Sequence, residues 1–205
     1  MHEEALTKQA ATLFPLFSKF KGFYLVGGTA LALQIGHRLS VDFDLFSSEK
    51  LPPNLLGQVK RVFSNSSIVV TYRAPEQLNL LIDNIQTTFF HYEYPVVNPF
   101  TEYKGVPLVS IQEIAAMKAF AVGKRLAYKD YIDWYFMLKE EYVTLQEVIS
   151  LCTQKFGNDF NDRLFLGQLV FMEDIPTQKI DFLRDPVGRE KIQAFLEVLV
   201  RHFEL

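Results

Sequence analysis

Two aspartates, Asp42 and Asp44, stand in a stretch of chain that alternates polar and apolar side chains. This alternation predicts a strand over residues 38–46. Its two faces would carry, in turn, Arg38, Ser40, Asp42 and Asp44, and Leu39, Val41, Phe43 and Leu45. Carboxylates two residues apart on one face stand roughly 7 Å apart at Cα, so their oxygens can converge on one Mg²⁺ ion or bridge two. We therefore expect a metal site suited to phosphoryl or nucleotidyl transfer, with a solvated edge strand as the alternative.

Upstream, the triplet Gly27-Gly28-Thr29 lies between an expected strand at 23–26 and an expected short helix that ends before Gly36. Glycines at such a turn let a phosphate approach the backbone, and the helix N-terminus and the Thr29 hydroxyl would supply hydrogen-bond donors. An ordinary structural turn is the alternative. Thirteen residues (29–41) separate Gly28 from Asp42, a spacing that allows the short helix to pack back and bring the turn beside the acidic strand.

A second group of charged residues lies in the C-terminal half. Four cations and no acid occur between Glu113 and Asp130, namely Lys118, Lys124, Arg125 and Lys129. Lys118 has apolar neighbours, where a lysine is costly unless it meets an anion, and a triphosphate would serve. Asp130 and Asp133 share a helix face and could accept a proton from an attacking hydroxyl or orient Arg125. A solvated helix face, with Lys129 paired to Asp133, is the alternative.

The motifs together resemble a known superfamily. Gly27-Gly28, thirteen residues, and then Asp42-Phe43-Asp44-Leu45 resemble the signature of DNA polymerase β-like nucleotidyltransferases. More narrowly, Gly-Gly-Thr-Ala-Leu-Ala-Leu (27–33) and His-Arg-Leu-Ser-Val-Asp-Phe-Asp-Leu-Phe (37–46) resemble the AbiEii/AbiGii toxin family. Lys118 on its small-residue helix resembles the second motif of that family, and Arg125 with Asp130 and Asp133 resembles the third.

The resemblance implies a Mg²⁺-dependent enzyme, with Mn²⁺ as an alternative, that transfers NMP from an NTP to an acceptor. It implies GTP or a pyrimidine triphosphate as donor and tRNA as acceptor. The toxin role in type IV toxin–antitoxin and abortive-infection systems would bring a separately encoded antitoxin as partner. Asp42 and Asp44 would hold metal; the expected nucleotide ligands are Gly27, Gly28, Thr29, Arg38, Ser40, Lys118 and Arg125; and the expected catalytic residues are Asp42, Asp44, Lys118, Asp130 and Asp133.

One feature departs from the superfamily pattern, in which active members carry a third carboxylate on a neighbouring strand. The corresponding segment, Thr87 to Tyr94, holds only Glu93 as an acid, with His91 on the same face by alternation. A catalytically inactive nucleotide-binding or interaction module that keeps the fold is therefore the competing hypothesis.

Composition sets wider limits. Among 205 residues, 49% are apolar, the formal net charge is −3 and there is one cysteine, Cys152. The apolar content allows a large core, and the negative charge argues against a protein that coats nucleic acid over a long footprint. The single cysteine predicts a cytoplasmic protein, and the acidic N-terminus and short apolar runs predict that it is not directed to a membrane.

The expected fold class is α+β, with a mixed nucleotidyltransferase sheet and flanking helices in residues 1–105 and a helical domain in 106–205 that completes the nucleotide cleft. The first part is expected to hold helices at 3–20 and 53–64 and strands at 68–72, 78–82 and 85–94, with a hairpin turn at Asp83-Asn84. Helices in the second part are expected at about 110–126, 128–140, 144–156 and 185–203. Ser110 with Glu113 and Thr144 with Glu147 are expected capping boxes, and Asp185-Pro186 is expected to begin the last helix.

Overall fold

The computed structural model describes residues 1–122 and 127–204. These residues form two compact units, Met1–Ser110 and Ile111–Leu205. The first is α+β and the second is helical, which confirms the expected fold class. The first unit extends past residue 105 because the strand Val106–Leu108 belongs to its sheet.

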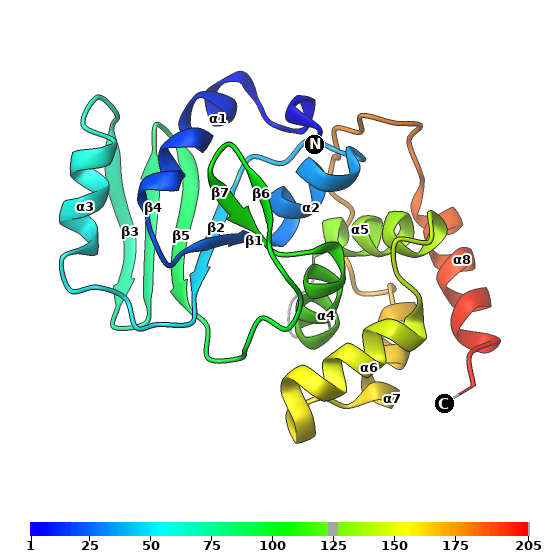
Figure 1. Cartoon of the computed structure of the whole chain (residues 1–205). Helices are drawn as coiled ribbons and strands as arrows, with labels where there is room; N and C mark the ends of the chain where they lie inside the picture. Colours follow the sequence, from blue (N-terminus) through cyan, green and yellow to red (C-terminus); the bar gives the residue numbers. More distant parts are fainter. Residues whose placement is uncertain (123–126, 205) are drawn as a thin grey trace. The chain divides into compact units, whose positions relative to one another are not determined.

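The first unit is built on a seven-stranded mixed sheet with the order β3-β4-β5-β2-β1-β7-β6 (Figure 1). β2 pairs parallel with β5 and antiparallel with β1, and β1 pairs parallel with β7. The strands are β1 (Tyr24–Val26), β2 (Phe43–Ser47), β3 (Ile68–Ala74), β4 (Gln77–Ile82), β5 (Ile85–His91), β6 (Thr101–Tyr103) and β7 (Val106–Leu108).

Two of the hairpin turns use residues with left-handed backbone. Asp83 and Asn84 have φ of 49° and 66°, the pattern of a two-residue turn whose twist matches that of the strands, so the predicted β4–β5 hairpin is confirmed. Lys104 and Gly105, with φ of 49° and 76°, join β6 to β7 in the same way. The sequence did not predict this hairpin, because three-residue strands are too short to show an alternation.

One face of the sheet is closed by a phenylalanine core. Phe43 on β2 packs against Phe14 and Phe17, with ring centroids 6.0 and 4.8 Å apart, and Phe89 on β5 packs against Phe20. Those partners come from an N-terminal segment that was expected to be one helix and is instead three short ones. They are η1 (Glu3–Ala5), α1 (Lys8–Leu13) and η2 (Phe14–Lys19).

The break has local causes. The Thr7 side chain accepts a hydrogen bond from the Ala10 amide and so begins a new helix, and Pro15 stands in the first turn of η2. The unit also contains α2 (Gly27–Ile35) and α3 (Leu55–Val62), near the positions expected for them.

The edge strand β3 has five consecutive exposed residues, 69–73, among them Val69 and Tyr72, which are 51% and 52% exposed. Its register with β4 shifts between Val70 and Tyr72, so that Thr71 is an extra residue in the strand.

The second unit contains α4 (Ile111–Ala121), α5 (Tyr128–Lys139), α6 (Leu145–Phe156), η3 (Gly157–Asp159), α7 (Asp162–Val170) and α8 (Arg189–Arg201). The predicted capping box of Thr144 and Glu147 is confirmed at the start of α6. α8 begins at Arg189 with Gly188 as its N-cap, so the predicted start at Asp185-Pro186 is wrong. In the described parts of the chain, no helix has the length and apolar character needed to cross a bilayer.

Candidate functional site

Asp44 occupies the centre of the sheet in the first unit. It lies on β2 between Val26 of β1 and Thr88 of β5, its register neighbours on either side. Phe43 and Leu45 are fully buried in the core, whereas Asp44 is half-buried, so the carboxylate projects from the opposite face of the sheet. Asp42 is also half-buried and lies just before the strand begins.

The predicted single strand over residues 38–46 is therefore only partly present. Regular structure starts at Phe43, and Val41, which was expected on the apolar face, is 45% exposed. The backbone before the strand bonds elsewhere, since the Ser40 amide donates to the Ala5 carbonyl at 2.9 Å. Alternation alone could not reveal this partner, which is remote in sequence.

The Gly27-Gly28 turn opens α2 directly beside Asp44. Gly27 has φ of +73°, and a Cβ there would lie 2.7 Å from Asp44 Oδ2. A Cβ at Gly28 would lie 2.6 Å from Arg38 Nη2 and 3.5 Å from Ser40 Oγ. The missing side chains thus leave room for a carboxylate and a guanidinium against the first turn of the helix. We call this arrangement of Gly27, Gly28, Arg38 and Asp44 the glycine cradle.

Thr29 ties the cradle to the acidic segment. Its hydroxyl donates to the backbone carbonyl of Asp42 and lies 2.8 Å from Ser40 Oγ. Thr29 is 2% exposed, and Arg38 is 4% exposed, with its Nη1 donating to the Leu39 carbonyl at 3.0 Å. The structure therefore brings together the six N-terminal candidates that follow Gly27, which are Gly28, Thr29, Arg38, Ser40, Asp42 and Asp44, around the start of α2.

The donor set suits a hard divalent cation. Mg²⁺ takes one or two protein carboxylates and completes its shell with water and phosphate oxygens, and Asp42 and Asp44 supply such a pair. Among residues 1–122 and 127–204, no group of three or more His, Cys, Asp or Glu side chains is placed to hold a metal. In chemical type, two carboxylates suit a cation whose remaining ligands would come from water and substrate.

The position beside Asp44 on the neighbouring strand is occupied by Thr88. His91, at the end of β5, pairs with Ser47, and Glu93 lies beyond the strand. Residues 85–91 contain no Asp or Glu, so β5 itself supplies no third carboxylate.

In the second unit, Lys118 meets two carboxylates. Its Nζ lies 2.6 Å from Asp130 Oδ1 and 2.8 Å from Asp133 Oδ2, and all three side chains are at most 7% exposed. The expected anionic partner of Lys118 is thus provided by α5 of the same unit. Arg125, the remaining candidate of this group, lies outside the described residues.

A second buried ion pair joins α4 to α6, and the sequence did not suggest it. Glu113 Oε2 accepts from Lys155 Nζ at 2.8 Å, with both side chains at 0% exposure. Glu113 was expected to act in a capping box with Ser110. A signal existed in the sequence, since Lys155 falls on the same helix side as Val148 and Cys152, which are core residues of α6.

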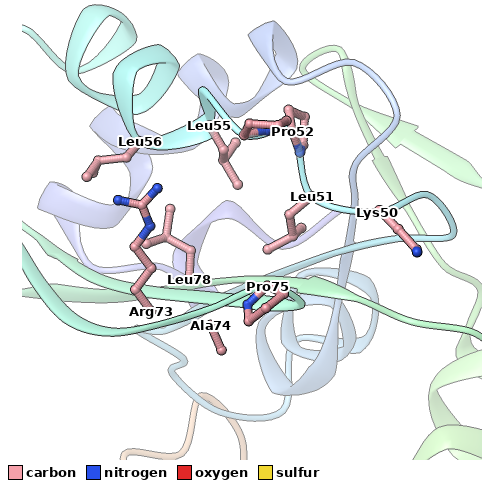
Figure 2. Close-up of a pocket in the computed structure, with 10 residues that line it drawn as sticks. Lys50, Leu51, Pro52, Leu55, Leu56, Arg73, Ala74, Pro75 and Leu78 are labelled. Atoms are coloured by element: carbon pink, nitrogen blue, oxygen red, sulfur yellow. The ribbon is translucent and has the colours of Figure 1, made fainter.

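A cavity of about 590 Å³ lies elsewhere in the first unit, between the start of α3 and the β3–β4 hairpin. Figure 2 shows Leu51, Leu55 and Leu78 around it, with Arg73 and Lys50 as its cationic residues. None of the residues that line it is a residue of the glycine cradle.

Comparison with solved structures agrees with this fold. The chain is similar to the crystal structure of an H. pylori protein described as a candidate nucleotidyltransferase, with a TM-score of 0.61 and 20% identity over 95% of this chain and 94% of the other. It is also similar to JHP933 from Helicobacter pylori, with a TM-score of 0.57 and 18% identity over 96% and 94% of the two chains.

Sequence comparison identifies the family. The chain is 34% identical to an uncharacterized protein of Aquifex aeolicus (strain VF5) over 184 residues, which cover 88% of this chain and 87% of the relative. Two overlapping segments, residues 11–103 and 75–205, match the family described as nucleotidyl transferase AbiEii toxin, type IV TA system. The chain therefore belongs to the AbiEii family of nucleotidyltransferase toxins.

Proposed function

We propose that this protein transfers an NMP group from an NTP to an acceptor in a Mg²⁺-dependent reaction. Family membership supports nucleotidyl transfer as the reaction class. The observation that carries the proposal to specific residues is the glycine cradle, where Asp44 and Arg38 lie against adjacent glycines of one helix start. A carboxylate that can bind a cation and a guanidinium that can bind an anion, beside adjacent residues, suit a complex of metal and triphosphate.

The residues of the cradle have distinct roles in this proposal. Asp42 and Asp44 hold Mg²⁺ or, as an alternative, Mn²⁺, which neutralises triphosphate charge and aligns the attacking and leaving oxygens. The Gly28 backbone and the Arg38 guanidinium bind phosphate oxygens, because helix N-termini and arginine forks both favour anions. Thr29 and Ser40 act as positioning residues, since the Thr29 hydroxyl fixes the backbone that carries Asp42.

The donor, acceptor and biological role follow the family. GTP or a pyrimidine triphosphate is the proposed donor and tRNA the proposed acceptor. Modification of tRNA would slow growth, and a separately encoded antitoxin would oppose the activity. Catalytic roles for Lys118, Arg125, Asp130 and Asp133 stay predictions; the contacts of Lys118 with both aspartates support a role in fixing α4 against α5.

A labelled-nucleotide assay tests the proposal. Wild type, Asp44→Asn and the matched control Glu76→Gln, which removes an exposed carboxylate on the β3–β4 turn, are incubated with Mg²⁺, pooled tRNA and each α-labelled NTP. We expect transfer by wild type and the control, and a loss of about 100-fold or more in Asp44→Asn, the scale for removing one transition-state-stabilising group. Equal transfer by Asp44→Asn would refute the metal role of Asp44.

A second candidate function is a nucleotide-binding module without catalysis. Thr88 favours it, because it occupies the place beside Asp44 where the superfamily pattern implies a third carboxylate. In that case wild type would bind NTP in the presence of Mg²⁺, the binding would weaken in Asp44→Asn, and no label would move to any acceptor.

A further inference from the structure

The sheet face that carries Asp44 presents two neighbouring rows of side chains. Register pairing across β2, β5, β4 and β3 sets the order along each row. The first row, which we call the polar row, is Asp44, Thr88, Asn79 and Tyr72. The second, which we call the aromatic row, consists of Phe46 and Phe90 and ends at Gln77. Phe46 comes two residues after Asp44 on β2, and Phe90 comes two residues after Thr88 on β5. The rows therefore lie roughly 7 Å apart.

The aromatic row differs from the aromatic core on the opposite face. Phe43 and Phe89 are 0% exposed, whereas Phe46 and Phe90 are only half-buried. The Phe46 and Phe90 ring centroids lie 5.1 Å apart, and Tyr92 extends the group at 5.3 Å from Phe46. A sheet face with adjacent, partly accessible aromatic rings is the arrangement on which single-stranded nucleic-acid bases stack.

Two amide side chains on β4 continue the rows. Gln77 Nε2 donates to Asn79 Oδ1 at 2.9 Å, and both residues are half-buried. This bond uses one of the two hydrogens of the Gln77 amide and one of the two lone pairs of the Asn79 carbonyl. The remaining amide donors and acceptors can pair with the polar edge of a base.

The members of the two rows on β5 and β4 lie on the side of Asp44 away from Gly27 and Gly28. Gly27 follows Val26 of β1, which flanks Asp44 on one side, while β5 and β4 lie on the other. In-line transfer requires the leaving pyrophosphate and the attacking hydroxyl on opposite sides of the transferred phosphorus. With the triphosphate in the cradle, the attacking hydroxyl comes from the β5–β4 side.

We infer that the aromatic row binds an unpaired end of the nucleic-acid acceptor, with the terminal base on Phe46 and Phe90 and the polar edge of that base towards Gln77 and Asn79. The inference rests on the proposed function, because the cradle defines the side from which the acceptor attacks. Stacking also suits the net charge of −3, since it needs few basic contacts to phosphate.

The test uses the full chain and a fluorescein-labelled single-stranded RNA of about ten nucleotides, within the usual site size for such binders. Phe90→Leu keeps apolar volume but removes the aromatic face, and Phe90→Trp restores one. Phe171→Leu, a half-exposed phenylalanine in the second unit, is the matched control. We expect the RNA dissociation constant from fluorescence anisotropy to rise roughly 5- to 100-fold in Phe90→Leu, and to stay near wild type in Phe90→Trp and Phe171→Leu.

The outcomes separate this inference from the proposed function. RNA affinity unchanged in Phe90→Leu, with thermal stability lowered, would make the row a packing feature and overturn the inference. Weaker NTP binding with unchanged RNA binding would assign the row to the donor base and would also overturn it. Label transfer by wild type in either case keeps the proposed function. Phe90-dependent RNA binding by a wild type that transfers no label supports the row and refutes the transferase.

Discussion

Replacing Gly28 by Ala probes the anion-binding side of the cradle. The new methyl carbon would lie 2.6 Å from Arg38 Nη2, so the guanidinium must retreat by about 1 Å to reach ordinary contact distance. It is the end of a flexible side chain, and Ala in a helix is favoured over Gly by up to about 1 kcal/mol, so the free energy of unfolding should stay level or rise slightly. The displaced guanidinium should lose its charge-assisted hydrogen bond to a phosphate oxygen of the NTP, which is worth about 1.5–3 kcal/mol. NTP binding should therefore weaken roughly 10- to 100-fold.

Gly27→Ala should behave differently at the adjacent position. Its φ of +73° makes any Cβ unfavourable by about 1–2 kcal/mol, and the methyl group would also press on Asp44 Oδ2. Gly22→Ala shares the strain, with φ of +82°, but has no atom within 4 Å of the new Cβ. The two variants should lose similar stability in urea unfolding, and only Gly27→Ala should lose Mg²⁺-dependent NTP binding.

Gly57→Ala, in α3 with no atom within 4 Å of its Cβ, is the control for Gly28→Ala. Calorimetric titration with NTP and Mg²⁺ measures the affinities of all four variants. Wild-type affinity in Gly28→Ala, or equal loss in Gly28→Ala and Gly57→Ala, would refute the assignment of the cradle as the phosphate site.

Two further predictions concern the second unit. Glu113→Gln leaves the buried Lys155 ammonium without its carboxylate and should lower the free energy of unfolding, measured in urea, by about 3–5 kcal/mol. The double variant Glu113→Leu with Lys155→Met should regain most of that free energy. Equal losses of stability in the single and double variants would contradict the pairing. Burial raises the pKa of Cys152 to about 12, so between about pH 9 and 12 the folded state keeps a proton that the unfolded state has lost. Relative to Cys152→Ala, the unfolding free energy should fall by about 1.4 kcal/mol per pH unit there, and at pH 8 a thiol reagent should react only after unfolding.

The parts of the fold that local sequence determines were predictable. The Asp83-Asn84 turn and the Thr144–Glu147 capping box each depend on residues close together in the chain, and both are confirmed. The spacing between Gly28 and Asp42 predicted that the turn would lie beside the acidic segment. Asp44 Oδ2 lies only 2.7 Å from the place that a Cβ of residue 27 would take, which fits that expectation.

Features that depend on distant partners were not predictable in the same way. The backbone of Ser40 bonds to Ala5, which shortens the predicted strand, and no local pattern marks that partner. The burial of Lys118 was evident from its neighbours, but the aspartates that neutralise it could be identified only once α4 and α5 were placed together. Likewise, the assignment of Thr88 as the neighbour of Asp44 requires the register of β2 against β5.

The irregular edge strand β3 bears on how the protein behaves at high concentration. A long exposed edge rich in β-branched residues, such as Val69 and Val70, can recruit the same edge of another copy and start aggregation. The extra residue at Thr71 interrupts the spacing of backbone donors and acceptors midway along that edge, and Arg73 adds a charge close by. Two copies could then pair along only one half of β3 at a time, so the bulge should prevent the sheet from growing from one molecule into the next. The exposed side chains of β3 stay accessible to solvent.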